Sequence, residues 1–248
     1  MSQKIISIII ATYNASDTIL GCLDSIENEI NSDCELIIID GNSTDNTLDL
    51  LNKKKELIDV LISEPDKGIY DAWNKGIEKS KGKWIMFLGA DDLLLKNSLL
   101  TYLEFLRERN SCDYDYVCAQ NEYINLDGKF IKYIGKEPKW KAMKYYMPAA
   151  HVASLHNKKL FDEIGFFNLE YKICADYELL SRKKNKLNYK FIDYKIAKMK
   201  TGGMSFSVRA LTEQFFIRRK HLNIIINVMT FLFQTSLFIK FKIKNKIT

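Results

Sequence analysis

Two adjacent carboxylates, Asp91 and Asp92, follow an apolar run over residues 84–88, two residues after it ends. Five apolar residues in a row are typical of a strand buried on both faces, and Gly89 and Ala90 then leave room for a ligand near the backbone. Ionised carboxylates side by side repel each other, so a hard divalent cation or ligand hydroxyls between them would stabilise the pair. The alternative is a solvated loop before a helix that Asn97 caps.

The elements that would position these carboxylates are alternating strands and helices. Apolar, β-rich runs predict strands at 5–11, 35–40, 58–62 and 83–88. Helical patterns lie between them: one after Ser16 or Asp17 as N-cap, one around 48–51 and one at 69–80. This spacing is typical of βαβ units, and it predicts an α/β fold with a mainly parallel sheet.

Four polar loops follow the predicted strands, at 12–16, 40–45, 63–68 and 91–92. In open α/β sheets, ligands bind beyond the carboxyl ends of the parallel strands. We therefore expect these four loops to converge on one crevice.

The second half of the chain has a less regular pattern. We expect strands at 115–119, 129–134 and 189–192, helices at 99–109, 158–164 and 176–182, and a flexible loop at 201–205. Residues from 208 to the end are expected to be mostly helical.

The charge of the chain is unevenly distributed. The formal net charge is +6, yet residues 182–248 hold 16 Lys and Arg side chains against only Asp193 and Glu213. A basic segment on an acidic body indicates an anionic partner, and its apolar content favours lipid head groups over nucleic acid. The five cysteines contain no CxxC pair, which is typical of reduced thiols in a cytoplasmic protein, and no signal peptide pattern precedes the first strand.

The C-terminal segment is apolar from 222 to 239 but carries several amide and hydroxyl side chains. Four lysines follow at alternating positions: Lys240, Lys242, Lys244 and Lys246. An interfacial helix beside anionic lipid fits this pattern better than a membrane span. The alternative is a helix packed on the domain or in a homodimer.

Five motifs in order resemble the family 2 glycosyltransferases of GT-A fold, especially bacterial enzymes of O-antigen, capsule and exopolysaccharide assembly. The resemblance covers residues 5–205. The motifs are IIIATYN at 8–14, IDGNSTD at 39–45, DKGIYDAWNKG at 66–76, GADD at 89–92 and ADYE at 175–178. The resemblance implies a GT-A domain at 1–205, with a nucleotide-sugar half at 1–110 and an acceptor half at 111–205, and a basic helical tail at 206–248.

The resemblance implies a nucleotide-sugar site built by the first three motifs. Tyr13 would lie against the base, and Asp40 would accept a hydrogen bond from the imide of uracil, which favours a UDP-sugar. Core packing of Tyr13 and a helix-capping role for Asp40 are the alternatives. The other residues assigned to this site are Thr12, Asn14, Ser43, Asp66, Lys67, Gly68, Asp71, Asn74 and Asp91. For the helical residues Asp71 and Asn74, a solvated helix face remains an equal alternative.

The resemblance also implies a metal site. Asp91 and Asp92 would be the remnant of the family's DxD element and would hold Mn²⁺ or Mg²⁺ against the diphosphate. Gly89 stands where many relatives have an acidic residue, which leaves fewer protein oxygens for the metal.

Asp176 matches the family's catalytic base, which takes the proton from the acceptor hydroxyl in a single displacement that inverts configuration. Its alternative role is an N-cap of the following helix. Glu178 ranks second as a base. His151 and His156 would contact the diphosphate of donor or acceptor, or else be structural residues.

The sequence thus predicts an inverting, metal-assisted glycosyltransferase that uses a UDP-sugar. The expected acceptor is a lipid-linked or growing glycan of surface polysaccharide biosynthesis, and the expected place is the cytoplasmic face of the membrane, reached through residues 221–248. A nucleotidyltransferase would need a Gly-rich first loop, which residues 12–16 lack. A non-catalytic, membrane-associated scaffold on the same fold is the remaining alternative.

Overall fold

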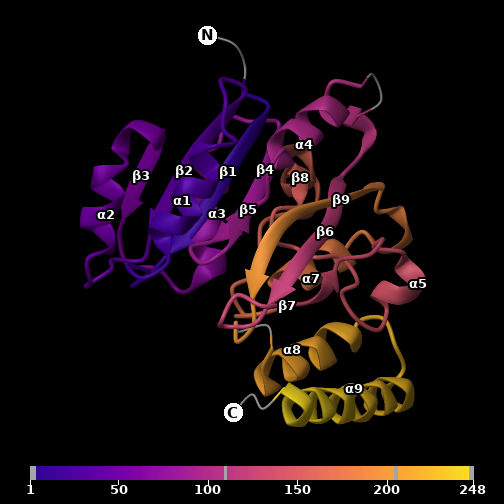
Figure 1. Ribbon diagram of the computed structural model, residues 1–248. Coiled ribbons are helices and arrows are strands. Elements are labelled where there is room, and N and C mark those ends of the chain that lie inside the picture. Colours follow the sequence, from indigo (N-terminus) through magenta and orange to yellow (C-terminus); the bar gives the residue numbers. More distant parts are fainter. Residues whose placement is uncertain (1–3, 109–110, 204–205, 246–248) are drawn as a thin grey trace.

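The computed structural model describes residues 4–108, 111–203 and 206–245. Its centre is one sheet with the strand order β3-β2-β1-β4-β8-β6-β9-β5, to which β7 adds beside β6 (Figure 1). The strands are β1 Ile6–Thr12, β2 Cys34–Asp40, β3 Val60–Ser63, β4 Trp84–Gly89, β5 Leu93–Leu94, β6 Tyr116–Ile124, β7 Phe130–Ile134, β8 Leu155–Asn157 and β9 Tyr189–Lys200. The helices are α1 Ile19–Glu27, α2 Thr47–Lys53, α3 Ile69–Lys79, α4 Ser98–Leu106, α5 Trp140–Met143, α6 Lys158–Ile164, α7 Ala175–Ser181, α8 Val208–Arg218 and α9 Ile224–Asn245.

The parallel half of the sheet is built around β1, which pairs with β2 on one side and β4 on the other. The register places Thr12 beside Asp40 and Ala11 beside Gly89, so the carboxyl ends of these strands meet at one edge. The predicted α/β fold is confirmed, and the four predicted strands of this half match the observed ones to within two residues at each end.

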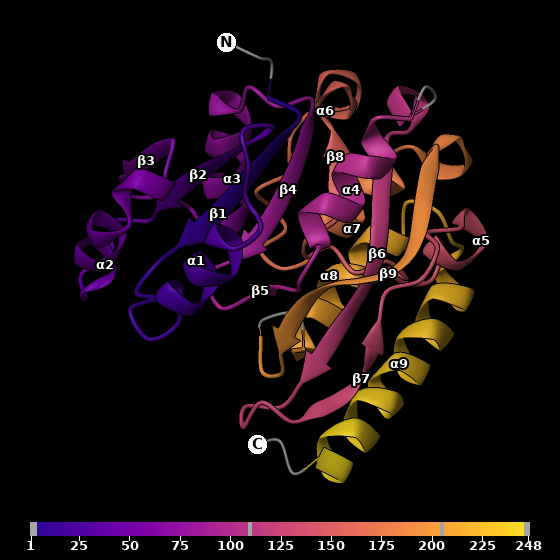
Figure 2. The same cartoon turned by 45° about the horizontal axis from the view of Figure 1, so that its top comes forward.

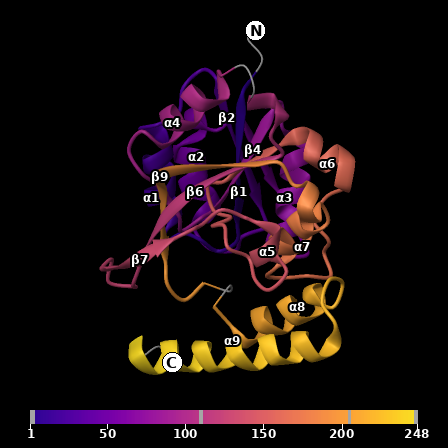
Figure 3. The ribbon, with the colours of Figure 1, turned by 90° about the vertical axis from the view of Figure 1, so that its right-hand side faces the viewer.

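Helices cover both faces of the sheet (Figure 3). Ile8 and Ile10 of β1 pack with residues of α1, α2 and α4, whereas Ile9 packs with residues of α3, α6 and α7. Because side chains alternate across a strand, an unbroken run of isoleucines can supply both layers of core at once.

The second half of the sheet differs from the sequence prediction. β9 does not stop at residue 192 but continues to Lys200, parallel to β6. The predicted end was wrong because lysines interrupt the apolar pattern after Ile192. In the fold, Lys195 lies over the Tyr133 ring and Lys198 faces Glu122, so neighbouring strands accommodate these charges. The three-residue strand β8 is too short to show a sequence pattern.

The helices α8 and α9 lie against the rest of the domain (Figure 1). The guanidinium of Arg218 is fully buried and donates to Asn227 and Gln234 of α9 and to the carbonyl of Tyr145. These bonds tie both helices to the body, as the packed-helix alternative expects. The predicted boundary at residue 205, the end of the predicted loop 201–205 and Lys246 lie outside the described residues.

Candidate active site

Asp40, the last residue of β2, organises the loop that follows it. Its carboxylate is fully buried and accepts four hydrogen bonds: one each from the Thr12 and Ser63 hydroxyls and two from Ser43, by the hydroxyl and the backbone N–H. Burial alone would raise the pKa of this carboxyl, but these hydrogen bonds outweigh burial and hold the pKa below its usual value. Helix α2 begins only at Thr47, so the helix-capping alternative for Asp40 is wrong.

Tyr13 and Asn14 form the adjoining turn after β1. Tyr13 is 64% exposed, so the core-packing alternative for this residue is wrong. Asn14 adopts a positive φ of 47°, and its N–H donates to the Ser43 hydroxyl at 2.8 Å, while its side chain accepts from the Thr44 N–H at 2.9 Å. These bonds lock the first two loops together beside an exposed aromatic ring.

The third loop reaches the same place through Asp66. A Cβ atom added at Gly41 would lie 2.6 Å from an Asp66 carboxylate oxygen and 3.4 Å from the Tyr13 ring. The other Asp66 oxygen accepts from the Gly68 N–H at 2.7 Å, which fixes the turn into α3. The structure therefore brings three predicted loops together, and Gly41 permits this close approach because it has no side chain.

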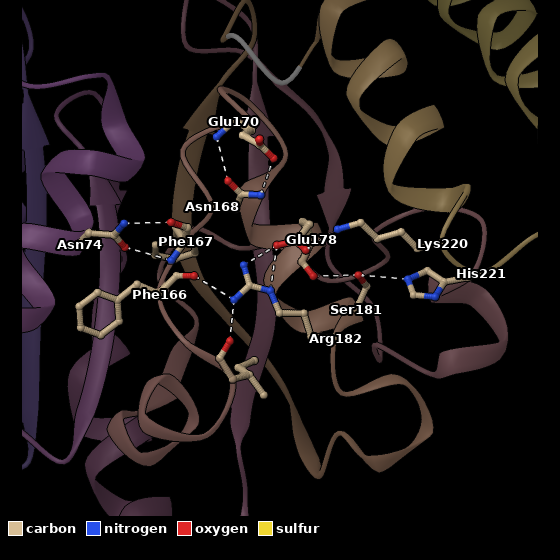
Figure 4. Close-up of polar contacts among 11 residues, drawn as sticks. Asn74, Phe166, Phe167, Asn168, Glu170, Glu178, Ser181, Arg182, Lys220 and His221 are labelled. Carbon is tan, nitrogen blue, oxygen red and sulfur yellow. Dashed lines mark hydrogen bonds and ion pairs between the residues drawn. The ribbon is translucent and has the colours of Figure 1, made fainter.

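The predicted polar face of α3 divides in two. The Asp71 carboxylate accepts a hydrogen bond from the backbone N–H of Lys67 at 2.9 Å, so it stabilises the loop at 63–68. Asn74 turns away from that loop: its amide donates to and accepts from the backbone of Phe167, each at 3.0 Å (Figure 4). Asn74 thereby joins α3 to the segment before α7. Its predicted contact with a nucleotide-sugar stays a prediction.

Asp91 and Asp92 converge over Gly89, where a Cβ atom would lie 3.0 Å and 2.9 Å from one oxygen of each. The space that an acidic side chain at position 89 would need is thus taken by the two carboxylates. Asp91 is exposed, whereas Asp92 is 6% exposed and accepts from the Gly89 N–H at 2.8 Å. Burial, and then the charge of Asp91, raise the pKa of Asp92 to about 8.

This carboxylate pair suits a hard divalent cation. One oxygen of each carboxylate lies near the same point, and a cation there would offset both the burial and the repulsion that raise the pKa of Asp92. No group of three or more His, Cys, Asp or Glu side chains forms a metal cluster in the described ranges 4–108, 111–203 and 206–245. The remaining ligands would therefore come from the substrate and water, which fits the departure at Gly89.

Asp176 lies in the first turn of α7, and Cys174 occupies the N-cap position without a side-chain cap bond. The N-cap alternative for Asp176 is therefore wrong. The Tyr70 hydroxyl donates its one proton in a shared hydrogen bond to the Asp176 carboxylate at 3.1 Å and to the carbonyl of Ile173 at 2.6 Å. The bond links α3, which follows the loop at 63–68, to α7, the helix that carries the predicted base.

His151 packs against α3 and β4. Its ring stacks on Phe87 of β4 at 5.5 Å and lies 5.1 Å from the Trp73 ring of α3. Burial lowers the pKa of His151, and the nearby charge of Asp176 opposes this effect. The buried His151 Nε2 and Trp73 Nε1 have no hydrogen-bond partner within the described chain. Both ring nitrogens of the neighbouring His156 are also without a partner in the described chain, so a contact of His151 with the diphosphate stays a prediction.

The other two predicted acceptor residues have structural surroundings. His156 is fully buried in β8, where its ring packs against Phe87 and Tyr116. Glu178 is 4% exposed and binds both Arg182 and Lys220 (Figure 4). Burial favours its neutral form, but these two cations outweigh burial and lower the pKa of Glu178, so it stays ionised and paired. Of the two predicted bases, Asp176 is thus the more accessible carboxylate, and its role as a base stays a prediction.

Sequence reasoning missed Glu213 on α8. Its carboxylate accepts three hydrogen bonds from successive backbone N–H groups at 172–174, at 2.9–3.0 Å, directly before α7. The one available signal was its isolation, because it is one of only two acidic residues in the strongly basic stretch 182–248. Tyr70 was also missed, although it lies within a quoted motif.

Comparison with known protein families identifies the family of the chain. The family model described as Glycosyl transferase family 2 matches residues 7–177, which include all the loops and aspartates above. The chain belongs to this glycosyltransferase family. The glycosyltransferase is 32% identical over 184 residues to the PGL/p-HBAD biosynthesis glycosyltransferase of Mycobacterium tuberculosis, covering 72% of this chain and 69% of that protein. It is 36% identical over 117 residues to the putative teichuronic acid biosynthesis glycosyltransferase TuaG of Bacillus subtilis, covering 46% of each.

Solved structures confirm the GT-A fold of the glycosyltransferase. The structure of S. aureus TarS (residues 1–349) in complex with UDP-GlcNAc matches with a TM-score of 0.68 at 16% identity, covering 92% of this chain and 70% of that one. The mannosyltransferase PcManGT from Pyrobaculum calidifontis, in complex with GDP-Man and Mn²⁺, matches with a TM-score of 0.65 at 15% identity, covering 88% and 65%.

Proposed function

We propose that this glycosyltransferase moves a sugar from a UDP-sugar to an acceptor hydroxyl in one displacement that inverts the anomeric configuration. The observation that carries the proposal is the Tyr70–Asp176 hydrogen bond, which connects the helix after the donor loops to a partly exposed carboxylate. Asp176 would accept the hydroxyl proton while that oxygen attacks the anomeric carbon. Glu213 would hold the segment before α7 so that Asp176 keeps its place.

The nucleotide would lie over the exposed ring of Tyr13, beside Asn14, Ser43 and the loop of Asp66, Lys67 and Gly68. An apolar ring next to oriented backbone groups is a typical arrangement for a nucleotide base. Asp40 is the proposed partner of the uracil imide, although its carboxylate already accepts hydrogen bonds from Thr12, Ser43 and Ser63. A contact with the base would therefore need a displacement of the Ser43 hydroxyl. The choice of UDP over GDP is supported by this residue alone.

Asp91 and Asp92 would hold Mn²⁺ or Mg²⁺, which would neutralise negative charge on the departing diphosphate. The chain's own part in this step is to keep both carboxylates over Gly89. The neighbour PcManGT was solved with Mn²⁺, which is compatible with such a site in this fold.

We propose a lipid-linked or growing glycan as the acceptor, handled at the cytoplasmic face of the membrane. The names of the relatives, which concern PGL/p-HBAD and teichuronic acid biosynthesis, support a surface glycoconjugate. Among the described helices, Ile224–Ile243 is long and apolar enough to cross a membrane, with a mean hydropathy of 1.7 and 6% of it buried. An interfacial position of this helix agrees with Lys240 and Lys242 in its last turns.

Calorimetry tests the donor site. UDP and GDP are titrated, each with and without Mn²⁺, into the protein and into its Asp91→Ala and Asp92→Ala variants. Metal-dependent binding of UDP that both variants lose is the expected result. Binding of neither nucleotide would overturn the transferase proposal and favour the scaffold alternative.

A further inference from the structure

An open apolar groove of about 1150 Å³ separates α9 from the sheet. It lies between α9 and the strands β6, β7 and β9, and Figure 2 shows α9 alongside β7. Six of the side chains that line it are Tyr123, Ile134, Met199, Phe206, Phe233 and Leu237. A groove of this size and composition is large enough for a hydrocarbon chain.

Helix α9 is apolar on two faces. Phe233 lines the groove and is 63% exposed, whereas its neighbour Leu232 does not line the groove and is 62% exposed. Exposed apolar surface this extensive on both sides of a helix marks an interaction surface in a soluble protein. Hydrocarbon could therefore cover α9 on both faces: inside the groove, against Phe233, and on the opposite side, against Leu232.

Two ammonium groups lie at one end of the groove. Lys132 lies over the Phe241 ring at 5.3 Å, and Lys242 lies over the Phe238 ring at 5.7 Å. Both rings pack on Phe206. The described lining contains no Asp or Glu side chain, so this end is suited to an anionic head group.

We propose that the groove binds one hydrocarbon chain of an anionic membrane lipid, with the lipid phosphate beside Lys132 and Lys242. The outer face of α9, which includes Leu232, would lie in the same membrane. A second copy that packed through the same groove would bring the same lysines to the interface, and the described groove lining has no Asp or Glu side chain to pair with them. This inference concerns a site apart from the donor loops, so it does not depend on UDP binding.

Point variants test the groove better than deletion of the helix. Deletion of α9 would remove Asn227 and Gln234 and leave the buried Arg218 guanidinium without these partners. The matched pair is Phe233→Glu, inside the groove, and Leu232→Glu, outside it. Both side chains are exposed to a similar degree, so neither change empties a core position.

The first readout is calorimetry with dodecyl phosphate below its micelle concentration, with inorganic phosphate as the head group alone. The parent and Leu232→Glu are expected to bind dodecyl phosphate, whereas Phe233→Glu binds it about tenfold more weakly or worse, since a charge would enter an apolar site. Inorganic phosphate alone is expected to bind far more weakly. The second readout is sedimentation with vesicles: the parent should bind phosphatidylglycerol vesicles more strongly than phosphatidylcholine vesicles, and both variants should lose binding.

Three results would overturn the proposal. They are a parent that does not bind dodecyl phosphate, equal weakening by both variants, and a lipid-free dimer that both variants dissociate. UDP titration of the same three proteins separates this test from the donor site. Unchanged UDP binding together with a failed lipid test would reject the groove alone.

Discussion

The buried carboxyl of Asp92 makes a specific prediction about stability and pH in the absence of metal. Its pKa is raised to about 8 in the fold, whereas an exposed aspartate titrates near 3.8. Between these values the folded protein binds the proton that the unfolded chain has released, so the free energy of unfolding falls as pH rises. Asp92→Asn removes this titration while its amide oxygen can still accept from the Gly89 N–H.

The expected magnitude follows from linkage. The stability of Asp92→Asn relative to the parent should rise by up to about 1.4 kcal/mol per pH unit between pH 5 and pH 7, and level off above pH 8. Urea unfolding in EDTA, followed by circular dichroism at pH 5, 6, 7 and 8, measures this difference. Asp91→Asn should show a smaller total rise of the same sign, confined to the pH range just below 8, because burial, the larger cause, still keeps the pKa of Asp92 raised and only the Asp91 charge is lost. Parallel stability curves for the parent and Asp92→Asn would refute the reasoning.

Three further substitutions separate binding, stability and turnover. Gly41→Ala places a methyl group 2.6 Å from a carboxylate oxygen and should weaken UDP binding about tenfold by calorimetry; unchanged affinity would contradict the proposed pocket. Asn74→Ala removes both hydrogen bonds to Phe167 and should cost about 2 kcal/mol in urea unfolding, with UDP affinity unaltered; a large loss of affinity would instead make Asn74 a donor ligand. Tyr70→Phe removes the hydrogen bond to Asp176 and should lower kcat about tenfold with donor KM preserved in steady-state assays; a rise in KM alone would contradict a positioning role.

The parallel half of the fold could be predicted because its strands are buried on both faces. Such strands read as unbroken apolar runs, and Ile8, Ile9 and Ile10 serve two cores at once. Helix starts were less predictable: α1 begins after Thr18 rather than Ser16 or Asp17, and Thr18 makes no side-chain cap bond. The Ser16 N–H is instead bonded to Asp45, a contact between loops that sequence spacing does not reveal.

The second half could not be predicted because distant partners determine it. In the sequence, the lysines of β9 interrupt the strand pattern. In the fold, Glu122 of β6 and Tyr133 of β7 lie beside two of these lysines, so the strand continues. Arg218 appears as one more charge of a basic tail, yet it is fully buried, since side-chain amides on α9 receive it.

The sequence predicted which residues gather at the candidate site better than it predicted what each of them contacts. The aspartates at 40, 66 and 91–92 were identified from loops at strand ends, and the structure brings the first three loops together and pairs Gly89, before the fourth, with Ala11. Glu178 was chosen by its motif, and Asn74 by its motif and its helical spacing from Asp71, and both are engaged in bonds that hold the fold. Glu213 was missed because a residue 37 positions after Asp176 gives no local sign that it holds the turn before α7.

The most direct test of the proposed mechanism is the rate of UDP release from a panel of UDP-sugars, measured with Mn²⁺ and a membrane lipid extract, for the parent and for Asp176→Asn. The account predicts that the variant binds UDP as the parent does but releases it about 100-fold to 10,000-fold more slowly, the usual effect of losing a general base. Equal rates for the two proteins would contradict the assignment of Asp176 as the base.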